Sequence, residues 1–373
     1  MANLVLYRKY RPKFFSEMIG QEHIVQTLTN AISFNITAHA YLFTGPRGTG
    51  KTTIARLLAK TVNCEKRKEK EHEPCNKCLS CLEINKNQAI DLVEIDAASN
   101  RGIDDIKELK QGIRFTPTRL KYKVFIIDEC HQLTKEAANA LLKTLEEPPS
   151  YAIFILATTE IHKMIPTIVS RCQRFDFRQL TLEEIIKRLE ILAKKEKVKI
   201  EKTALELIAL NSQGAIRDAE GLLDQAITFA GANQEKVIKA EDIKDILGLI
   251  ETQLISKFVD YLVDKNLSEA ILFLNEIFIK GCDTQEFIKQ LINYLRQGLL
   301  LKINSDLNNP MIIGLIKEEQ KHLKQQITNL TEKDLVNILN IFISAQQQIR
   351  YSSIPQLPLE LAIVEILDKE VIA

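Results

Sequence analysis

The sequence predicts an α/β domain with a parallel five-stranded sheet and helices on both faces, followed by two helical domains. The first half of the chain holds five strand-like runs, at Ala40–Thr44, Leu92–Ile95, Lys123–Ile127, Ala152–Ala157 and Arg174–Phe177. The first four are apolar runs, which is typical of strands buried on both faces. Helical patterns such as Thr52–Val62 and Lys135–Leu145 separate the runs. This alternation indicates a doubly wound fold.

The pattern changes after about residue 180, where amphipathic helices replace the strand-like runs. Thr181 followed by Glu184 is a capping box that opens a helix. Breaks at Asn211–Gly214 and Gly231–Gln234 divide the following helices, and the rest of the chain is almost all helical. We therefore expect an α/β domain over 1–180, a small helical lid over 181–243 and an all-helical domain over 244–373.

Composition limits the possible classes of protein. The chain has 373 residues, which favours two or three domains, and a formal net charge of only +1. Any contact with nucleic acid must therefore come from a local patch rather than from a global basic field. The apolar runs are too short for a membrane span and the N-terminus has no signal-peptide pattern. We expect a cytoplasmic protein with no membrane partner.

A phosphate-binding loop lies between the first strand and the helix that follows it. The segment Gly45–Thr52 reads GPRGTGKT, which fits the pattern G-x-x-x-x-G-K-[ST] in the strand-to-helix context that the motif requires. Lys51 can reach the β- and γ-phosphates, Thr52 can bind Mg²⁺, and the helix N-terminus favours an anion. The loop indicates a nucleoside triphosphate but no reaction. The predicted binding residues are Gly45, Pro46, Arg47, Gly48, Thr49, Gly50, Lys51, Thr52 and Thr53.

Two acids, Asp128 and Glu129, end the strand that begins at Lys123. This is a Walker B arrangement, in which Asp128 holds Mg²⁺ through water and Glu129 polarises the attacking water. An accidental pair of carboxylates at the end of a buried strand is costly. The segment Asp128–His131 also reads DECH, which resembles a helicase box, but no other helicase motif lies at a suitable spacing.

Three further polar residues can be assigned a functional role only in combination with these motifs. Thr159 follows the next apolar strand, where a hydroxyl can bond the γ-phosphate or the attacking water, as a sensor 1 residue does. Arg171 lies in the triplet Ser-Arg-Cys, and Arg217 lies near the start of a helix in the lid. A threonine at a strand end or a bare arginine is otherwise an ordinary surface residue.

Four of the seven cysteines crowd into 18 positions, at Cys64, Cys75, Cys78 and Cys81. Clustered cysteines in a cytosolic chain indicate a metal rather than disulfides. Four thiolates suffice for a closed tetrahedral Zn²⁺ site, so we expect a structural zinc. The alternative is four free thiols. The charged run Glu65–Glu73 between the first two cysteines is expected to be a solvated loop.

Taken together, the motifs resemble those of AAA+ ATPases, and specifically the gamma/tau family of bacterial DNA polymerase III clamp-loader subunits. Seven ordered blocks carry the resemblance: YRKYRPKFFSEMIGQEHI, HAYLFTGPRGTGKTTIARLLAKTVNC, EIDAASNRGIDDI, KVFIIDECHQLTKEAANALLKTLEEPP, ILATTE, SRCQRFDF and GAIRDAEGLLDQ. The family also carries the four-cysteine module in this position, although the first spacing here is somewhat longer.

The resemblance implies roles for individual residues. Arg171 would be an arginine finger that reaches the ATP of a neighbouring subunit, and Arg217 would be the sensor 2 residue of its own subunit. Permanent charge and a forked shape suit arginine to both positions. The family contacts DNA backbone through helix N-termini, and the matching residues are Ser99, Asn100 and Arg101.

The function that the resemblance implies is an ATP-hydrolysing motor that loads the sliding clamp onto primed DNA during replication. Its cofactors would be ATP, Mg²⁺ and a structural Zn²⁺. Its partners would be the delta and delta-prime subunits, copies of itself, the clamp and primed-template DNA, and the last domain would be the collar that joins the subunits. Two rivals remain: a non-hydrolysing scaffold subunit, which the intact Lys51 and Glu129 disfavour, and another AAA+ DNA motor, which the cysteine insert disfavours.

Overall fold

The computed structural model describes residues 4–68, 70–99, 112–113, 115–231, 237–247, 252–303 and 317–368. The chain divides into two compact units, residues 1–240 and 241–373. The first unit holds the strands, together with the helices that cover them and the helices that directly follow them. Within its described residues, the second unit contains helices joined by turns and no strand.

One parallel five-stranded sheet organises the first unit, as predicted. Its strands are β1 (Ala40–Thr44), β2 (Leu92–Asp96), β3 (Lys123–Asp128), β4 (Ala152–Thr158) and β5 (Gln173–Asp176), in the spatial order β2-β3-β4-β1-β5. Because all five strands run the same way, their carboxyl ends meet at one edge of the sheet. Ligands of open α/β sheets bind at that edge.

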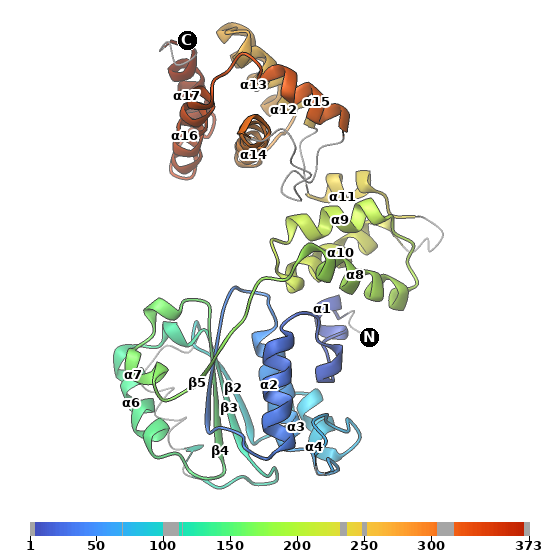
Figure 1. The fold of residues 1–373 in the computed structure, drawn as a ribbon, viewed down its shortest axis with the longest axis vertical. Helices are drawn as coiled ribbons and strands as arrows, with labels where there is room; N and C mark the ends of the chain where they lie inside the picture. Colours follow the sequence, from blue (N-terminus) through green and yellow to red (C-terminus); the bar gives the residue numbers. More distant parts are fainter. Residues whose placement is uncertain are drawn as a thin grey trace. The chain divides into compact units, whose positions relative to one another are not determined.

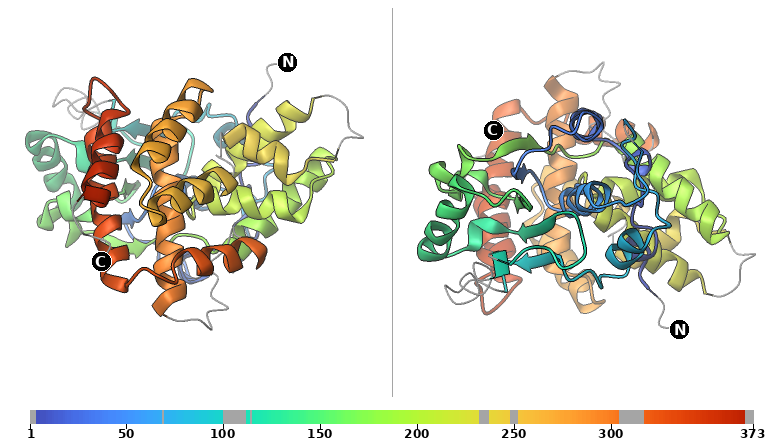
Figure 2. Two further views of the ribbon diagram at one scale, coloured as in Figure 1. Left: turned by 90° about the horizontal axis from the view of Figure 1, so that it is seen from above. Right: turned by 90° about the horizontal axis from the view of Figure 1, so that it is seen from below.

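Helices cover both faces of this sheet (Figures 1 and 2). Successive side chains of β1 point to opposite faces, as the pleat requires. Tyr41 and Phe43 belong to the core beneath α2 (Glu22–Ser33) and α3 (Lys51–Val62). Their neighbours on β1 belong to the core beneath α6 (Lys135–Glu146) and α7 (Pro166–Val169), at Ala40 and Leu42. Burial on both faces explains why the strands read as unbroken apolar runs.

Short elements surround the sheet. They are α1 (Leu6–Lys9) and η1 (Phe15–Glu17) before the first strand, α4 (Leu79–Asn85) in the cysteine insert, and η2 (Cys130–Gln132) and η3 (Ile161–Lys163) after β3 and β4. Three lid helices follow β5, namely α8 (Leu182–Glu196), α9 (Lys202–Asn211) and α10 (Ile216–Ala230). The predicted capping box opens α8, with Thr181 and Glu184 each bonding the other's backbone N–H.

The second unit has its own core. Its helices are α12 (Thr252–Val263), α13 (Leu267–Ile279), α14 (Thr284–Ile303), α15 (Lys317–Gln326), α16 (Glu332–Ile349) and α17 (Leu357–Asp368), with α11 (Ala240–Leu247) at its start. Phe258, Phe287 and Phe342 are fully buried in this core. Within the described residues, no helix combines the length and apolarity that crossing a bilayer requires.

Candidate nucleotide-binding site and metal centre

A cavity of about 460 Å³ lies at the carboxyl edge of the sheet in the first unit. Residues from the predicted phosphate loop, from the end of β3, from the segment before α2 and from the lid line it. The predicted binding residues Gly45 and Pro46 are not among the described residues that line it. The predicted site residues that do line it are Arg47, Gly48, Thr49, Gly50, Lys51, Thr52, Thr53, Asp128, Glu129 and Arg217. Residues more than 150 positions apart in the sequence thus face one space.

The loop between β1 and α3 curls tightly because two of its glycines leave no room for a side chain. A Cβ on Gly45 would lie 2.2 Å from the carbonyl oxygen of Phe177, and one on Gly48 would lie 2.8 Å from Cβ of Ala215. Both glycines also have positive φ, at 139° and 77°. Since Ala215 precedes α10, the loop packs directly against the lid.

Lys51 is the first residue of α3 and is only 6% exposed. Its Nζ donates hydrogen bonds to the carbonyl oxygens of Gly45, at 2.7 Å, and Pro46, at 2.8 Å. Burial lowers the pKa of this ammonium group, and the nearby carboxylates of Glu129 and Asp128 oppose that shift. The loop therefore holds the cation where it can meet phosphate oxygens.

Thr52 and Asp128 meet at the bottom of the cavity. The Thr52 hydroxyl donates a 2.7 Å hydrogen bond to Oδ2 of Asp128, and Oδ1 of Asp128 accepts from the Glu129 backbone N–H at 3.0 Å. A hydroxyl beside a carboxylate offers the hard oxygen ligands that Mg²⁺ prefers. The two residues therefore fit the predicted magnesium ligands.

Glu129 follows β3 with φ of 47°, a left-handed conformation that is strained for a residue with a side chain. Its Oε2 accepts from the hydroxyl of Thr159 at 2.8 Å and from the Thr159 backbone N–H at 3.3 Å. The imidazole Nδ1 of buried His131 lies 3.4 Å from the same oxygen. The predicted sensor 1 residue thus contacts the carboxylate that is predicted to polarise water.

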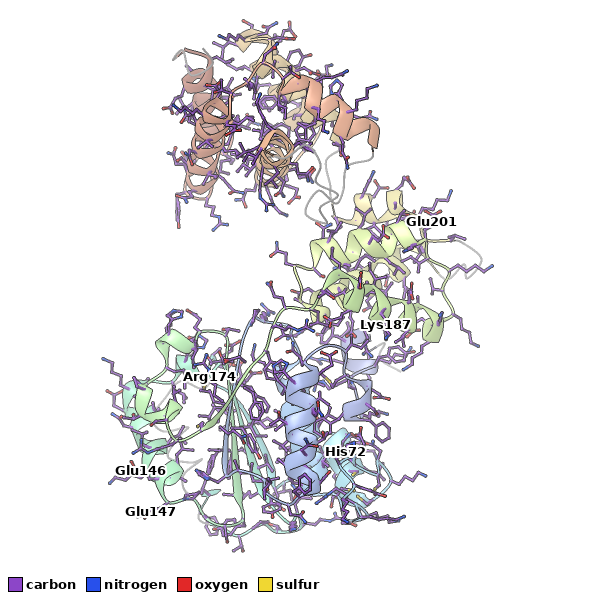
Figure 3. All side chains as sticks on the ribbon, viewed as in Figure 1. His72, Glu146, Glu147, Arg174, Lys187 and Glu201 are labelled. Atoms are coloured by element: carbon purple, nitrogen blue, oxygen red, sulfur yellow. The ribbon has the colours of Figure 1, made fainter. Side chains whose placement is uncertain are left out.

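The two predicted arginines occupy different places. Arg217 lines the cavity, and its guanidinium carbon lies 4.7 Å from the ring centroid of Tyr7. A hydrogen bond donated by the Arg217 guanidinium lowers the pKa of the Tyr7 hydroxyl. Arg171 is not among the described residues that line the cavity. Its side chain is 34% exposed and pairs with Oε1 of Glu146 at 2.6 Å. Glu146 lies at the carboxyl end of α6 (Figure 3).

Motif patterns did not predict the parts of the cavity formed by the segment before α2, by the end of β2 and by the lid residues other than Arg217. Two lid residues meet there: Nε of Arg188 lies 2.7 Å from Oε1 of Glu220, both side chains being 7% exposed. Arg188 also donates to the carbonyl oxygen of Tyr10 at 2.7 Å. The available signal was the N-terminal block YRKYRPKFFSEMIG, which carried the resemblance but received no role. The missed lining residues are Tyr7, Arg11, Pro12, Glu17, Met18, Ile19, Asp96, Ala98, Arg188, Ile216 and Glu220.

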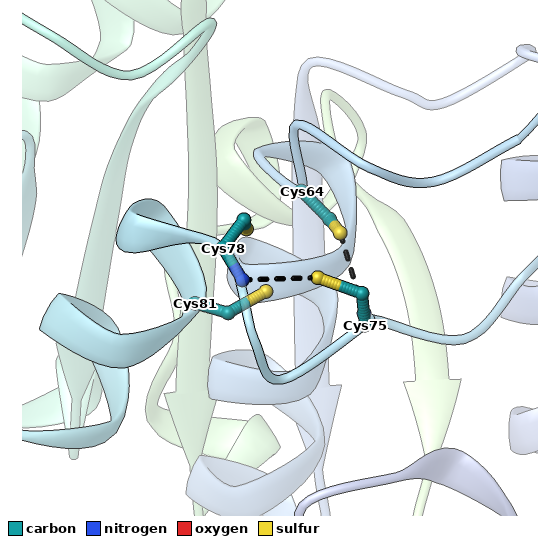
Figure 4. A group of neighbouring side chains, drawn as sticks. All are labelled: Cys64, Cys75, Cys78 and Cys81. Carbon is teal, nitrogen blue, oxygen red and sulfur yellow. Dashed lines mark hydrogen bonds between the residues drawn. The ribbon is translucent and has the colours of Figure 1, made fainter.

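The four clustered cysteines converge, with all four Sγ atoms within 4.8 Å of one another (Figure 4). Zn–S bonds of about 2.3 Å place the corners of a tetrahedron about 3.8 Å apart, so the sulfurs fit such an ion. Backbone N–H groups already face the sulfurs, from Cys75 to Sγ of Cys64 at 3.3 Å and from Cys78 to Sγ of Cys75 at 3.2 Å. The arrangement is that of a structural metal site.

The pKa values of the cysteines differ with their surroundings. Burial raises the pKa of Cys75, but the backbone N–H groups of Lys77 and Cys78 outweigh it and lower the value to about 6. Burial also raises the pKa of the Cys81 thiol. A cation among the sulfurs would favour the thiolate form of all four.

Two other predictions concern the charged run in the cysteine insert and the predicted DNA-contact segment. The described residues of the run Glu65–Glu73 form an irregular and mostly exposed loop, as predicted. Glu65 accepts from Ser80, and Glu73 accepts two backbone hydrogen bonds from the segment before α2. In the predicted DNA-contact segment, Ser99 donates to Oδ2 of Asp96 at 3.1 Å. Asn100 and Arg101 lie outside the described residues.

A phosphate loop, an acidic strand end and a helical lid on one parallel sheet define a nucleotide-binding P-loop protein of the AAA+ class. Three family models match successive parts of the chain: "DNA polymerase III, delta subunit" over residues 20–181, "DNA polymerase III clamp loader subunit, ATPase lid domain" over 184–232 and "DNA polymerase III subunits gamma and tau domain III" over 238–371. The chain belongs to the family of DNA polymerase III gamma and tau subunits.

Individual relatives agree with this membership. The chain is 43% identical to DNA polymerase III subunit tau of Bacillus subtilis over 366 residues, which cover 98% of this chain and 63% of that protein. It is 33% identical to DNA polymerase III subunit gamma of Buchnera aphidicola subsp. Acyrthosiphon pisum, over 97% of this chain and 98% of that one. The RuvB branch migration motor of Thermotoga maritima matches with a TM-score of 0.48 at 19% identity, over 84% of this chain and 98% of that one. This last likeness is too weak to bear on function.

Proposed function

We propose that this chain is the ATP-hydrolysing motor subunit of a DNA polymerase III clamp loader, which places the sliding clamp on primed DNA. The observation that carries the proposal is a set of five side chains: Lys51, Thr52, Asp128 and Glu129 line one cavity, and Thr159 is bonded to Glu129. A scaffold subunit that does not hydrolyse ATP has no need of this complete set. Family membership supports the same conclusion.

In the proposed reaction, water attacks the γ-phosphate and ADP and phosphate leave. Lys51 would bind the β- and γ-phosphate oxygens, and Thr52 with Asp128 would hold a Mg²⁺ ion that neutralises charge on those oxygens. Glu129 would orient the attacking water, and the Thr159 hydroxyl would orient Glu129. Positioning and charge stabilisation suffice for this chemistry, so no covalent enzyme intermediate is required.

The two arginines would link hydrolysis to assembly. Arg217, at the start of a lid helix, would leave the Tyr7 ring to reach ATP in its own subunit. Arg171 lies away from that cavity and is partly exposed, so it suits action on the ATP of a neighbouring subunit. Such a finger contributes roughly 10³–10⁵ in rate. Hydrolysis would then depend on contact with copies of the chain or with delta and delta-prime subunits.

The remaining parts would support the loader. The four cysteines would bind one structural Zn²⁺, since four sulfurs leave no open coordination position. The second unit, residues 241–373, would serve as the collar that joins the subunits. The segment Ser99–Arg101 would contact the DNA backbone at a helix N-terminus.

An ATPase assay of the reconstituted complex tests the proposal. The chain is mixed with its delta and delta-prime partners, and phosphate release is measured with and without the clamp and primed DNA. We expect the two additions together to stimulate hydrolysis, and Glu129→Gln to remove the stimulated rate while ATP still binds. A complex that hydrolyses no ATP under any of these conditions would overturn the motor assignment.

A further inference from the structure

The cysteine insert is bonded to the segment that lines the nucleotide cavity. Glu73, two residues before Cys75, accepts a hydrogen bond from the backbone N–H of Phe15 on Oε2 and another from that of Ser16 on Oε1, both at 2.8 Å. Asn76, one residue after Cys75, donates from Nδ2 to the carbonyl oxygen of Lys13 at 3.0 Å. Three bonds from two side chains therefore hold residues 13–16 against the insert.

A buried lysine of the phosphate-loop helix is hydrogen-bonded to both the insert and the N-terminal segment. Lys60 of α3 is only 3% exposed, and its Nζ donates to the carbonyl oxygen of Lys13 at 2.9 Å. The same ammonium group donates to Oδ1 of Asn76 at 2.8 Å and to Oδ1 of Asn85, in α4, at 3.0 Å. The ammonium group of Lys60 thus links the phosphate-loop helix to both the insert and the N-terminal segment.

The segment held in this way forms one wall of the cavity. Pro12, Glu17, Met18 and Ile19 line the cavity on either side of the residues that Glu73 and Asn76 hold. Phe15 lies between them with 1% of its surface exposed, packed in the core beneath α2 and α3. The methyl carbon of Met18 would lie only 3.1 Å from a Cβ on Gly50, so this wall contacts the phosphate loop closely.

We propose that Glu73 and Asn76 are positioning residues for nucleotide binding, and that the metal-bound cysteine module acts as a brace for the cavity wall. A metal on Cys75 would fix the backbone that carries both residues, and they in turn fix residues 13–16. Loss of the metal frees this backbone, so the wall moves and nucleotide affinity falls. The proposal rests on the proposed function in two respects: the cavity binds a nucleotide and the cysteines bind zinc.

The test compares Glu73→Gln with Glu71→Gln in the full chain. Glutamine can accept only one of the two N–H bonds, because its –NH₂ group is itself a donor, and it lacks the carboxylate charge. Glu71 lies on the same insert, and within the described residues its carboxylate accepts from the backbone N–H of Lys68 and not from residues 13–16, so it is the matched control. Three quantities are measured: zinc per chain, the Kd of Mg·ATP by calorimetry, and amide hydrogen exchange of the peptide that covers residues 12–19.

For Glu73→Gln we expect unchanged zinc, faster exchange in residues 12–19 and a Kd raised about tenfold, the size of effect that loss of a charge-assisted bond produces. In the reconstituted complex the KM for ATP should rise while kcat stays within about twofold, as for lost ground-state binding. Glu71→Gln should match the wild type in every measurement. Either unchanged exchange or an unchanged Kd in Glu73→Gln overturns the proposal.

A replacement variant and a zinc-removal experiment keep the proposal testable if Glu73→Gln does not fold. If Glu73→Gln does not fold, Asn76→Gly replaces it, since glycine keeps the positive φ of 52° at that position and deletes only the side chain. Removal of zinc from the wild type by a chelator should raise the Kd and the exchange rate, and added zinc should restore both. Nucleotide binding that persists unchanged without zinc contradicts the brace. A wild-type chain that binds no Mg·ATP, by contrast, contradicts the proposed function itself.

Discussion

The hydroxyl of Thr159 donates a 2.8 Å hydrogen bond to Oε2 of Glu129. The bond joins the ends of two neighbouring strands and fixes a carboxylate whose own backbone is in a left-handed conformation. A carboxylate held in this way is oriented before a water molecule arrives, which favours its use as the group that positions the water.

Glu129→Gln should therefore lower kcat of the assembled complex by about 10²–10⁴, because the amide cannot polarise water as a carboxylate does. Thr159→Val should reduce kcat less, since it removes only the orienting bond. Both variants should bind Mg·ATP as the wild type does, which calorimetry checks. Glu147→Gln is the control, because Glu147 is an exposed carboxylate at the end of α6 that is not among the described residues lining the cavity. Normal hydrolysis by Glu129→Gln would contradict this role.

Lys51→Ala should reduce affinity for Mg·ATP on the order of 100-fold or more, because it removes charge-assisted bonds to phosphate oxygens. Titration of the isolated chain with a fluorescent ATP analogue measures the loss. Lys143→Ala, in α6, should leave affinity unchanged, since Lys143 is not among the residues that line the cavity. Retained binding in Lys51→Ala would place the phosphates elsewhere.

Arg171→Ala should keep ATP binding but lower the ATPase rate of the complex with clamp and DNA by about 10³ or more. The guanidinium would act on the neighbouring subunit's nucleotide, so the isolated chain should be unaffected. Arg174→Ala is the matched control, as Arg174 is an exposed arginine on nearby β5 that pairs with Asp176 (Figure 3). If both variants hydrolyse ATP at the wild-type rate in the complex, Arg171 is not a finger.

Metal analysis of the purified chain should find about one zinc per chain, because four thiolates form one closed tetrahedral site. Cys81→Ser should lose most of that zinc and melt at a lower temperature, since a structural site can contribute on the order of 10 kcal/mol to folding. Cys282→Ser, which alters a cysteine outside the cluster, should keep its zinc. A wild-type chain without any bound metal would refute the zinc assignment.

The capping box of α8 should contribute to the pH dependence of stability. The hydrogen bond from Arg178 lowers the pKa of Glu184 from 4.5 to about 2, although partial burial opposes the shift. A lowered folded-state pKa means that the stabilisation is complete above about pH 5 and is lost as pH falls towards 2. Glu184→Gln should lower the free energy of unfolding by about 1 kcal/mol at pH 7.

Urea denaturation at pH 7, 5 and 3 measures this effect. The difference between wild type and Glu184→Gln should shrink as the pH falls, because protonation removes the charge that the variant already lacks. Glu183→Gln alters the adjacent exposed carboxylate and should leave both the stability and its pH dependence unchanged. A difference that stays constant from pH 7 to 3 would show that the Glu184 charge does not contribute.

Local patterns predicted the strands and the phosphate loop because their causes are local. Burial on both faces requires apolar runs, as in Ala152–Thr158, and a phosphate loop requires glycines at set places, as at Gly45 and Gly48. The cysteine spacing likewise brought four sulfurs together through one short segment. The bonds from Glu73 to the backbone of the N-terminal segment, by contrast, could not be predicted from the charged composition of the run Glu65–Glu73.

The sequence by itself therefore determined the fold class, the family and the identity of the residues at the phosphate and cysteine sites. Only the tertiary structure decided which of them meet. Glu73 bonds the backbone of Phe15 across 58 positions, and Arg217 stacks on Tyr7 across a longer separation still. The physical reason is that such contacts depend on how whole elements pack against one another, whereas periodicity and motif spacing report only on neighbouring turns of the chain.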